Sequence, residues 1–223
     1  VRKHFEDIPG GETPPVVNLQ EPLQHEEKRR HWYDAFAPLP AWMCAYHVPQ
    51  KGTDEHYALE LAEKILFDGE SSRMYRRLVQ EEQLVVHLYG GLDGKHGPGT
   101  MIMFAQIKPV EAAAQVEAVI AEEVEKLLRE PISERELQKI KNQFKMEFAS
   151  KLEKVYYKSE MLCHYTMMFD DPGLINKEIE RYDSISEADV KNAIAKWIKP
   201  TNRSVVEVYP ATEKTKNEYV PNI

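Results

Sequence analysis

Histidines are the first residues to consider for chemistry in this chain, because a hydrolytic zinc site needs three or more converging His, Cys or carboxylate ligands. No two of the histidines lie four residues apart, the spacing that places two imidazoles on one turn of a helix. The nearest arrangement is His56 with Glu60, which we interpret as a surface pair on a charged helix. The sequence therefore predicts no catalytic residue and no metal ligand in this chain. The histidines are His4, His25, His31, His47, His56, His87, His96 and His164.

Cys163 and His164 are adjacent and could suggest a thiol nucleophile with its base. Successive residues of a helix point about 100° apart, so the two side chains cannot readily share a proton. We interpret them as a helix thiol beside a polar histidine. The surrounding Met and aromatic residues favour a core position, although such an adaptable stretch could also line a cavity or a partner surface. These residues are Met161, Met167, Met168, Tyr156, Tyr157, Tyr165 and Phe169.

The segment 90–99 contains five of the ten glycines and invites comparison with a phosphate-binding loop. It lacks the Gly-Lys-Ser/Thr ending of a P-loop and precedes a predicted strand, not a helix. We therefore predict that it is the loop of a β-hairpin.

The elements that must position these residues follow from apolar periodicity. Aromatic and β-branched runs predict strands over 29–37, 41–47, 84–89, 101–107 and 205–208, the fourth as a continuous apolar run suited to a buried strand.

Helices are predicted between these strands, with capping residues marking several of their starts. Ser133 and Ser186 each open a predicted capping box. No Gly or Pro lies between Ser133 and Asp170, so that segment is one long helix or two joined by a kink. The predicted helices begin after Thr53, at 72–82, after Pro109, after Ser133, at 174–182 and after Ser186.

Blocks of helix separate pairs of strands in this order, which differs from strict alternation of strand and helix. The pattern predicts an α+β fold, with helices covering one face of a mixed or mainly antiparallel sheet.

Composition excludes several classes of function. The chain has 223 residues, 42% of them hydrophobic and 30% charged, as in globular domains. A formal net charge of -8 argues against a nucleic-acid partner. No apolar run approaches the length that spans a bilayer, so no membrane span is predicted. Whether Cys44 and Cys163 form a disulfide stays open.

The first 23 residues predict a boundary. The chain begins with Val1, which suggests a processed protein or a piece of a longer one, and a proline-rich stretch over 9–23 cannot sustain a helix. We therefore expect 1–23 to be the end of a preceding domain plus a linker, 24–212 to be one domain, and 213–223 to be a loose tail.

Taken in order, these segments resemble the carboxy-terminal half of a subunit of the pitrilysin/insulinase family of zinc metallopeptidases, which includes the mitochondrial processing peptidase. The match is to the bacterial type with two domains per subunit and spans nearly the whole chain. The matching residues are His4–Pro9, Tyr46–Pro49, Asp68–Val79, Ser133–Leu137 and the closing strand at 205–208.

The resemblance implies helices packed on a mainly antiparallel sheet, and two subunits that close around a chamber for peptide substrates. The family's zinc motif, His-x-x-Glu-His, lies in the amino-terminal half, and this chain contains no such motif. Zinc is therefore expected in the amino-terminal half of a parent polypeptide, which would be this domain's first partner. The resemblance also implies export to the cell envelope.

The family's carboxy-terminal half often contributes an Arg and, seven residues later, a Tyr, which hold the peptide and support the developing oxyanion. Val79 and Val86 occupy these positions here, and neither can donate a hydrogen bond. The resemblance therefore implies a second family subunit that carries the pair. An alternative is a structural or assembly subunit without peptidase activity, like the core proteins of respiratory complexes, and a third is an unrelated binding domain.

Overall fold

The computed structural model describes the chain except for residues 1, 13, 16, 23, 109 and 212–223, and the side chain of Val110. Five strands form one mixed sheet in the order β1-β5-β2-β4-β3. The neighbours β1 and β5 are parallel, whereas the other three pairings are antiparallel. The strands are β1 (Lys28–Asp34), β2 (Ala41–Val48), β3 (Val85–Asp93), β4 (Gly99–Ile107) and β5 (Arg203–Pro210).

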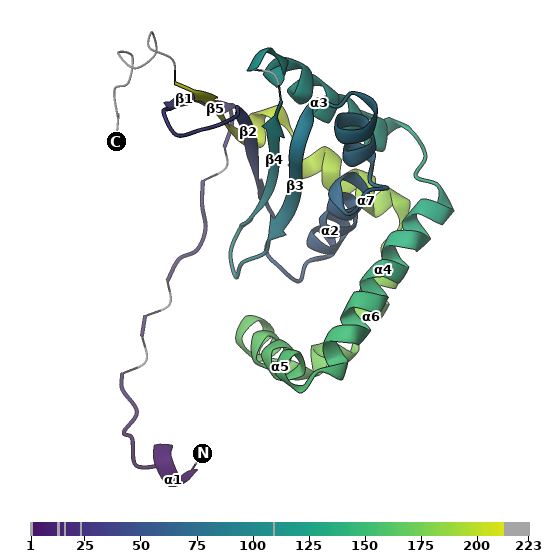
Figure 1. Ribbon diagram of the computed structural model, residues 1–223. Coiled ribbons are helices and arrows are strands. Elements are labelled where there is room, and N and C mark those ends of the chain that lie inside the picture. The colour runs from purple at the N-terminus through teal and green to yellow at the C-terminus, as the bar shows by residue number, and fades with distance from the viewer. Residues whose placement is uncertain (1, 13, 16, 23, 109, 212–223) are drawn as a thin grey trace.

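Three helices cover one face of this sheet (Figure 1): α2 (Asp54–Phe67), α3 (Ala113–Arg129) and α7 (Glu187–Trp197). Alternate residues of β4 are buried against them, which is the two-residue period of a strand with one covered face. The expected buried strand at 101–107 is therefore confirmed as a strand, but every second side chain of β4 is half-buried. The predicted α+β fold, with helices on one face of a mainly antiparallel sheet, is confirmed.

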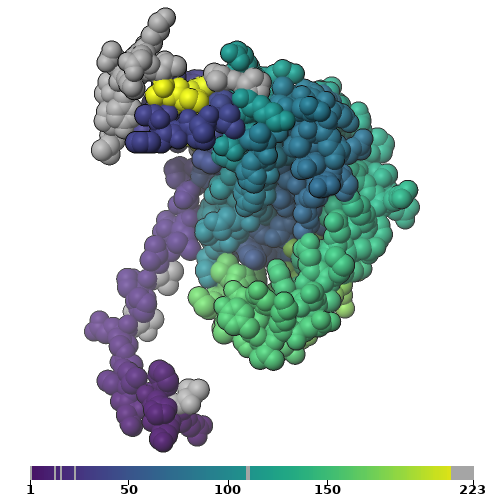
Figure 2. Space-filling model, in the orientation of Figure 1, coloured from purple at the N-terminus to yellow at the C-terminus, as the bar shows by residue number. Residues whose placement is uncertain are grey.

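The helices α4 (Glu134–Glu153) and α5 (Val155–Phe169) form an arm that reaches beneath the body of the molecule (Figures 1 and 2). Of the two alternatives for the segment after Ser133, the structure has two helices, because Lys154 takes an extended conformation between them. The chain returns through a 3₁₀ helix, η3 (Pro172–Asn176), and α6 (Glu178–Ser184). The single helix expected at 174–182 is therefore wrong. We call α4, α5, η3 and α6 the arm.

The glycine-rich segment is a hairpin, as predicted, but its loop is shorter than 90–99. The strand β3 continues to Asp93, and β4 begins at Gly99. Two glycines allow the hairpin to lie close to α2: a Cβ atom at Gly90 would come within 2.3 Å of the Phe67 ring, and one at Gly94 within 2.6 Å of the His56 ring. Close packing explains these glycines without a phosphate ligand.

The two predicted capping boxes differ in outcome. Ser186 and Asp189 exchange both hydrogen bonds of a capping box at the start of α7. At α4, Ser133 accepts a hydrogen bond from the backbone N–H of Glu136, but the Glu136 carboxylate binds Arg73, at 2.7 and 3.0 Å. Bidentate pairing with a guanidinium takes the place of the second capping bond.

Before β1 the described residues include one short helix, α1 (Arg2–Phe5), and then a largely exposed segment without helix or strand up to residue 27 (Figure 1). The domain boundaries at 23 and 212 remain predictions, and the loose tail expected at 213–223 lies outside the described residues. Within the described part of the chain, no helix is long and apolar enough to cross a membrane.

Candidate functional site

Three backbone irregularities follow one another between α2 and the hairpin. Residues Tyr75–Glu81 form a π-helix, η1, where the sequence pattern predicted a short ordinary helix over 72–82. Gln83 then adopts a positive φ of 53°, and the pairing of β3 with β4 shifts register between Val85 and His87. Such π-turns and bulges cost regular hydrogen bonds and are frequent at functional sites. We call residues 75–93 the edge segment, because β3 lies at the edge of the sheet.

The edge segment contains both positions where the family resemblance implied Arg and Tyr. Val79 lies in the π-helix and is partly buried against the hydrophobic core. Val86 lies at the register shift of β3, with 48% of its surface exposed. Their apolar side chains have no donor for a peptide or an oxyanion.

The arginine nearest to these positions has intramolecular partners. Arg77 lies 2.8 Å from Glu82, 3.2 Å from Glu122 and 3.1 Å from the buried Glu123. Glu81 is a fourth carboxylate, 3.8 Å away, so the Arg77 guanidinium is paired within the chain and anchors the π-helix to α3, which leaves it poorly placed to hold a substrate.

His56 and Glu60 lie side by side on α2, with 3.4 Å between His56 Nε2 and Glu60 Oε1. The prediction that this is a surface pair is wrong: His56 is only 1% exposed, because it packs beneath the hairpin at Gly94. No group of three His, Cys, Asp or Glu side chains suited to a metal occurs among the described residues. A two-ligand pair does not fit a zinc site, which needs at least three protein ligands.

A cluster of two carboxylates, Glu60 and the buried Glu178, and two buried tyrosines joins α2 to α6. Tyr57 donates a hydrogen bond to Glu178 at 3.0 Å, and Tyr182 donates one to Glu60. Burial opposes ionisation of Glu60, but the nearby His56 ring and the hydrogen bond from Tyr182 outweigh it and lower its pKa. Burial raises the pKa of Glu178, despite its hydrogen bonds to Tyr165 and Tyr57. Sequence patterns did not indicate this cluster, because Glu60 and Tyr182 are 122 positions apart.

The arm explains the Met-rich and aromatic stretch. Tyr165 is buried and Met161 packs beside it in a second small core, whereas Tyr156 and Met167 are about three-quarters exposed. The expectation that the stretch is core therefore holds for one side of α5 only. Cys163 is an exposed free thiol.

Cys44 is a free thiol too, so the structure contains no disulfide between the two cysteines. It is fully buried in β2, and burial raises the pKa of its thiol to about 12. At neutral pH this thiol is protonated and therefore a poor nucleophile.

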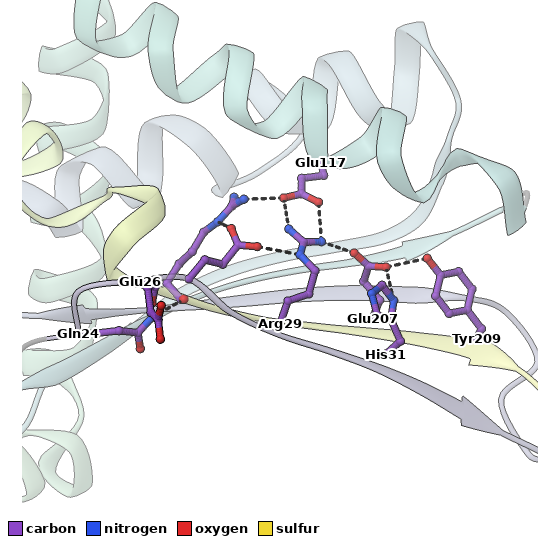
Figure 3. A network of polar contacts seen from close by, with 9 residues as sticks. Gln24, Glu26, Arg29, His31, Glu117, Glu207 and Tyr209 are labelled. Atoms are coloured by element: carbon purple, nitrogen blue, oxygen red, sulfur yellow. Dashed lines mark hydrogen bonds and ion pairs between the residues drawn. The ribbon is translucent and has the colours of Figure 1, made fainter. Parts of the chain in front are cut away.

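A network of ions fixes the first strand to the rest of the sheet (Figure 3). Arg29 of β1 contacts Glu117 of α3 at 2.7 Å and also pairs with Glu207 of β5. His31 and Tyr209 approach the same Glu207 carboxylate, at 3.0 and 2.8 Å. Hydrogen bonds to Glu117 and Glu27 raise the pKa of Arg29 above the ordinary value of an arginine, although burial acts in the opposite direction. The network consists of mutually satisfied charges, and we interpret it as structural.

At Val79 and Val86 the edge segment thus provides no hydrogen-bond donor, and no group of three metal-ligating side chains occurs among the described residues. A family model described as the Peptidase M16 inactive domain matches residues 1–144. The chain belongs to this family. The predicted membership of a zinc metallopeptidase family, as its inactive domain, is therefore confirmed.

Named relatives agree with this assignment. The chain is 23% identical over 211 residues to a zinc protease, PqqE, from Helicobacter pylori; the match covers 94% of this chain and 47% of that protein. The chain therefore spans about half the length of this curated relative.

Solved structures show the same fold. A protease from Helicobacter pylori superposes with a TM-score of 0.85 at 23% identity, over 94% of this chain and 51% of that one. A peptidase M16 inactive domain from Pseudomonas fluorescens gives a TM-score of 0.73 at 16% identity, over 90% and 48%.

Proposed function

We propose that this chain is the supporting, non-catalytic carboxy-terminal half of a zinc metallopeptidase subunit, where it completes one wall of a peptide-binding chamber. The observation that supports this most is the edge segment: its backbone is irregular, as at many functional sites, but Val79 and Val86 are apolar. A wall with this surface can contact a peptide without taking part in its hydrolysis.

The zinc would lie in the amino-terminal half of the parent polypeptide. There, bound metal would activate water for peptide hydrolysis. The family's Arg and Tyr would come from a second family subunit, because Val79 and Val86 cannot replace them. The extended segment before β1 would connect the two halves, and the ion network around Arg29 would fix the point where the connection enters this domain.

The test compares three preparations with one quenched-fluorescence peptide: this chain alone, the parent polypeptide alone, and the parent copurified with its partner subunit. The chain alone should show no hydrolysis above a metal-free control. The parent alone should be weakly active, and the complex should be fully active and sensitive to a zinc chelator. Full activity of the parent purified without a partner would overturn the division of labour.

The same assay addresses a structural or assembly role. A complex that contains no zinc and shows no hydrolysis in any preparation would indicate a scaffold and contradict the proposed peptidase role.

A further inference from the structure

A cavity of about 440 Å³ lies between the body of the molecule and the arm. Its size falls in the range of sites that bind small molecules or single side chains. Glu60 of α2 lies on one side, residues of α4 and α5 on another, and Glu178 and Tyr182 of α6 close the third. The body and the arm therefore both contribute to its wall.

Carboxylates and aromatic rings dominate the lining. Four glutamates line the cavity against two lysines, Lys51 and Lys151. Five aromatic rings lie among them. Carboxylates provide charge for a cation, and ring faces attract the same cation through their quadrupole. The glutamates are Glu60, Glu147, Glu160 and Glu178.

Two of these carboxylates are held in place before any ligand binds. The Tyr182 hydroxyl donates a hydrogen bond to Glu60, and the Tyr57 hydroxyl donates one to Glu178. Fixed carboxylates lose little conformational freedom on binding a ligand, so more of the interaction contributes to affinity.

The cavity also has an unused hydrogen-bonding group. His164 contributes to the lining, and its Nε2 atom is buried without a hydrogen-bond partner. In the tautomer protonated on Nδ1, this nitrogen accepts a hydrogen bond from an N–H donor. Such an orphaned buried atom is costly unless a ligand satisfies it.

The opposite side of the tyrosine cluster already binds a guanidinium. Arg181 lies over the Tyr57 ring, 5.5 Å from its centre, and donates to the Tyr57 hydroxyl at 3.2 Å. Tyr57 in turn donates to Glu178, so one guanidinium is accommodated directly behind the cavity wall.

From this geometry we infer that the cavity binds the charged side chain of an arginine or lysine residue in a peptide. The aliphatic stem would pack on the rings, and the charged group would reach Glu60 and Glu160, with His164 accepting one hydrogen bond. The inference rests on the proposed peptide chamber and adds to it a preference for basic residues.

The test measures binding to the whole 223-residue chain by NMR, using methionine methyl groups as reporters. N-acetyl-arginine amide and N-acetyl-lysine amide should shift the Met161 methyl signal, because Met161 lines the cavity. Met43, on β2, should not shift. The neutral isostere N-acetyl-citrulline amide should bind at least about tenfold more weakly, since it lacks the charge.

Variants localise the effect. Glu60→Gln combined with Glu160→Gln should weaken binding of the arginine probe about tenfold or more, whereas the matched change Glu153→Gln, on the same arm outside the cavity, should leave it unchanged. Thermal unfolding checks that each variant is folded. If the double variant does not fold, the inference is tested by comparing the binding of the arginine and citrulline probes to the unchanged chain.

Equal binding of arginine and citrulline probes, or shifts away from Met161, would overturn the inference. The NMR binding test does not depend on peptidase activity. Binding in the cavity together with an inactive parent would therefore contradict only the proposed function, and an active parent without binding here would contradict only the cavity.

Discussion

The edge segment and the arm cavity are opposite cases within one chain. The edge segment has irregular backbone at the two positions where the family resemblance implied an Arg and a Tyr, but its side chains there are Val79 and Val86. The cavity is built largely from regular helices, but most of its side chains carry a carboxylate, an amine, an imidazole or a hydroxyl. The difference shows that unusual backbone alone does not provide chemistry, and that ordinary helices can provide a polar site when tertiary packing brings them together.

The largest effect is expected when a buried side chain of the edge segment is truncated, which leaves a cavity in the core. Leu78 is fully buried in the π-helix, so Leu78→Ala should lower the free energy of unfolding by about 2–5 kcal/mol. The measurement is unfolding in urea. Val86→Ala, at an exposed position of the same segment, is the control and should change it by less than about 0.5 kcal/mol. An equal, small loss for both would show that the segment is not packed as described.

In the region of the cavity, the loop before α2 contacts the end of α5 at Gly52, where the lack of a side chain allows the close approach. Gly52 has a φ of 91°, and a Cβ atom there would lie 2.5 Å from the Phe169 ring. Gly52→Ala should therefore cost about 2–4 kcal/mol from backbone strain and overpacking together.

Gly69 provides the matched control, because its φ is 76° and nothing lies within 4 Å of a Cβ atom there. Gly69→Ala should cost only the strain, about 1–2 kcal/mol. Hydrogen exchange should also show faster opening of α5 in Gly52→Ala alone. Equal costs and unchanged exchange would mean that the arm does not rest on this loop.

The two valines should respond differently to the family's residues. Val79 packs on the core, so Val79→Arg should destabilise by about 1–3 kcal/mol as the guanidinium is forced out or buried. Val86→Tyr, at an exposed strand position, should change stability by less than about 0.5 kcal/mol. Denaturant titrations of both variants test this. A neutral Val79→Arg would show room for the family's arginine and weaken the argument that a partner supplies it.

The smallest effect concerns the acidity of the cavity's surroundings. Burial raises the pKa of Glu63 to about 7, and Asp68, Glu60 and Glu147 add to the effect against Lys64. A carboxyl with a raised folded-state pKa stabilises the fold below its unfolded pKa, near 4.5, and this contribution is lost as the pH rises through 7. Glu63→Gln should therefore raise the free energy of unfolding at pH 8 by about 1–2 kcal/mol.

The difference between Glu63→Gln and the unchanged chain should shrink as the pH falls from 8 to 4.5. The exposed Glu153→Gln should differ from the unchanged chain by less than about 0.5 kcal/mol at both pH values. A gain for Glu63→Gln that does not depend on pH would indicate that the carboxylate is not the cause.

The sequence predicted the five strands and the starts of α2, α4 and α7, because capping residues and apolar periodicity are local signals. Thr53 and Ser186 cap α2 and α7 as expected. The π-helix escaped prediction because its apolar pattern is close to that of an ordinary helix. The sequence left one long helix and two helices open after Ser133, because no Gly or Pro marks the break at Lys154.

The cavity could not be foreseen, because its parts are distant in sequence and none is unusual alone. Glu60 was visible only as half of a pair with His56, and the hydroxyl that fixes it belongs to Tyr182, on another helix. That Val79 and Val86 stand where the resemblance implied an Arg and a Tyr is, in contrast, a prediction made from the sequence alone.

The central claim is that this domain supports a peptidase without containing its chemistry. The most direct measurement is the zinc content of the purified 223-residue chain, made together with its rate of peptide hydrolysis. We predict far less than one zinc per chain and a rate equal to that of a metal-free control. One zinc per chain, with hydrolysis that a chelator abolishes, would contradict the account.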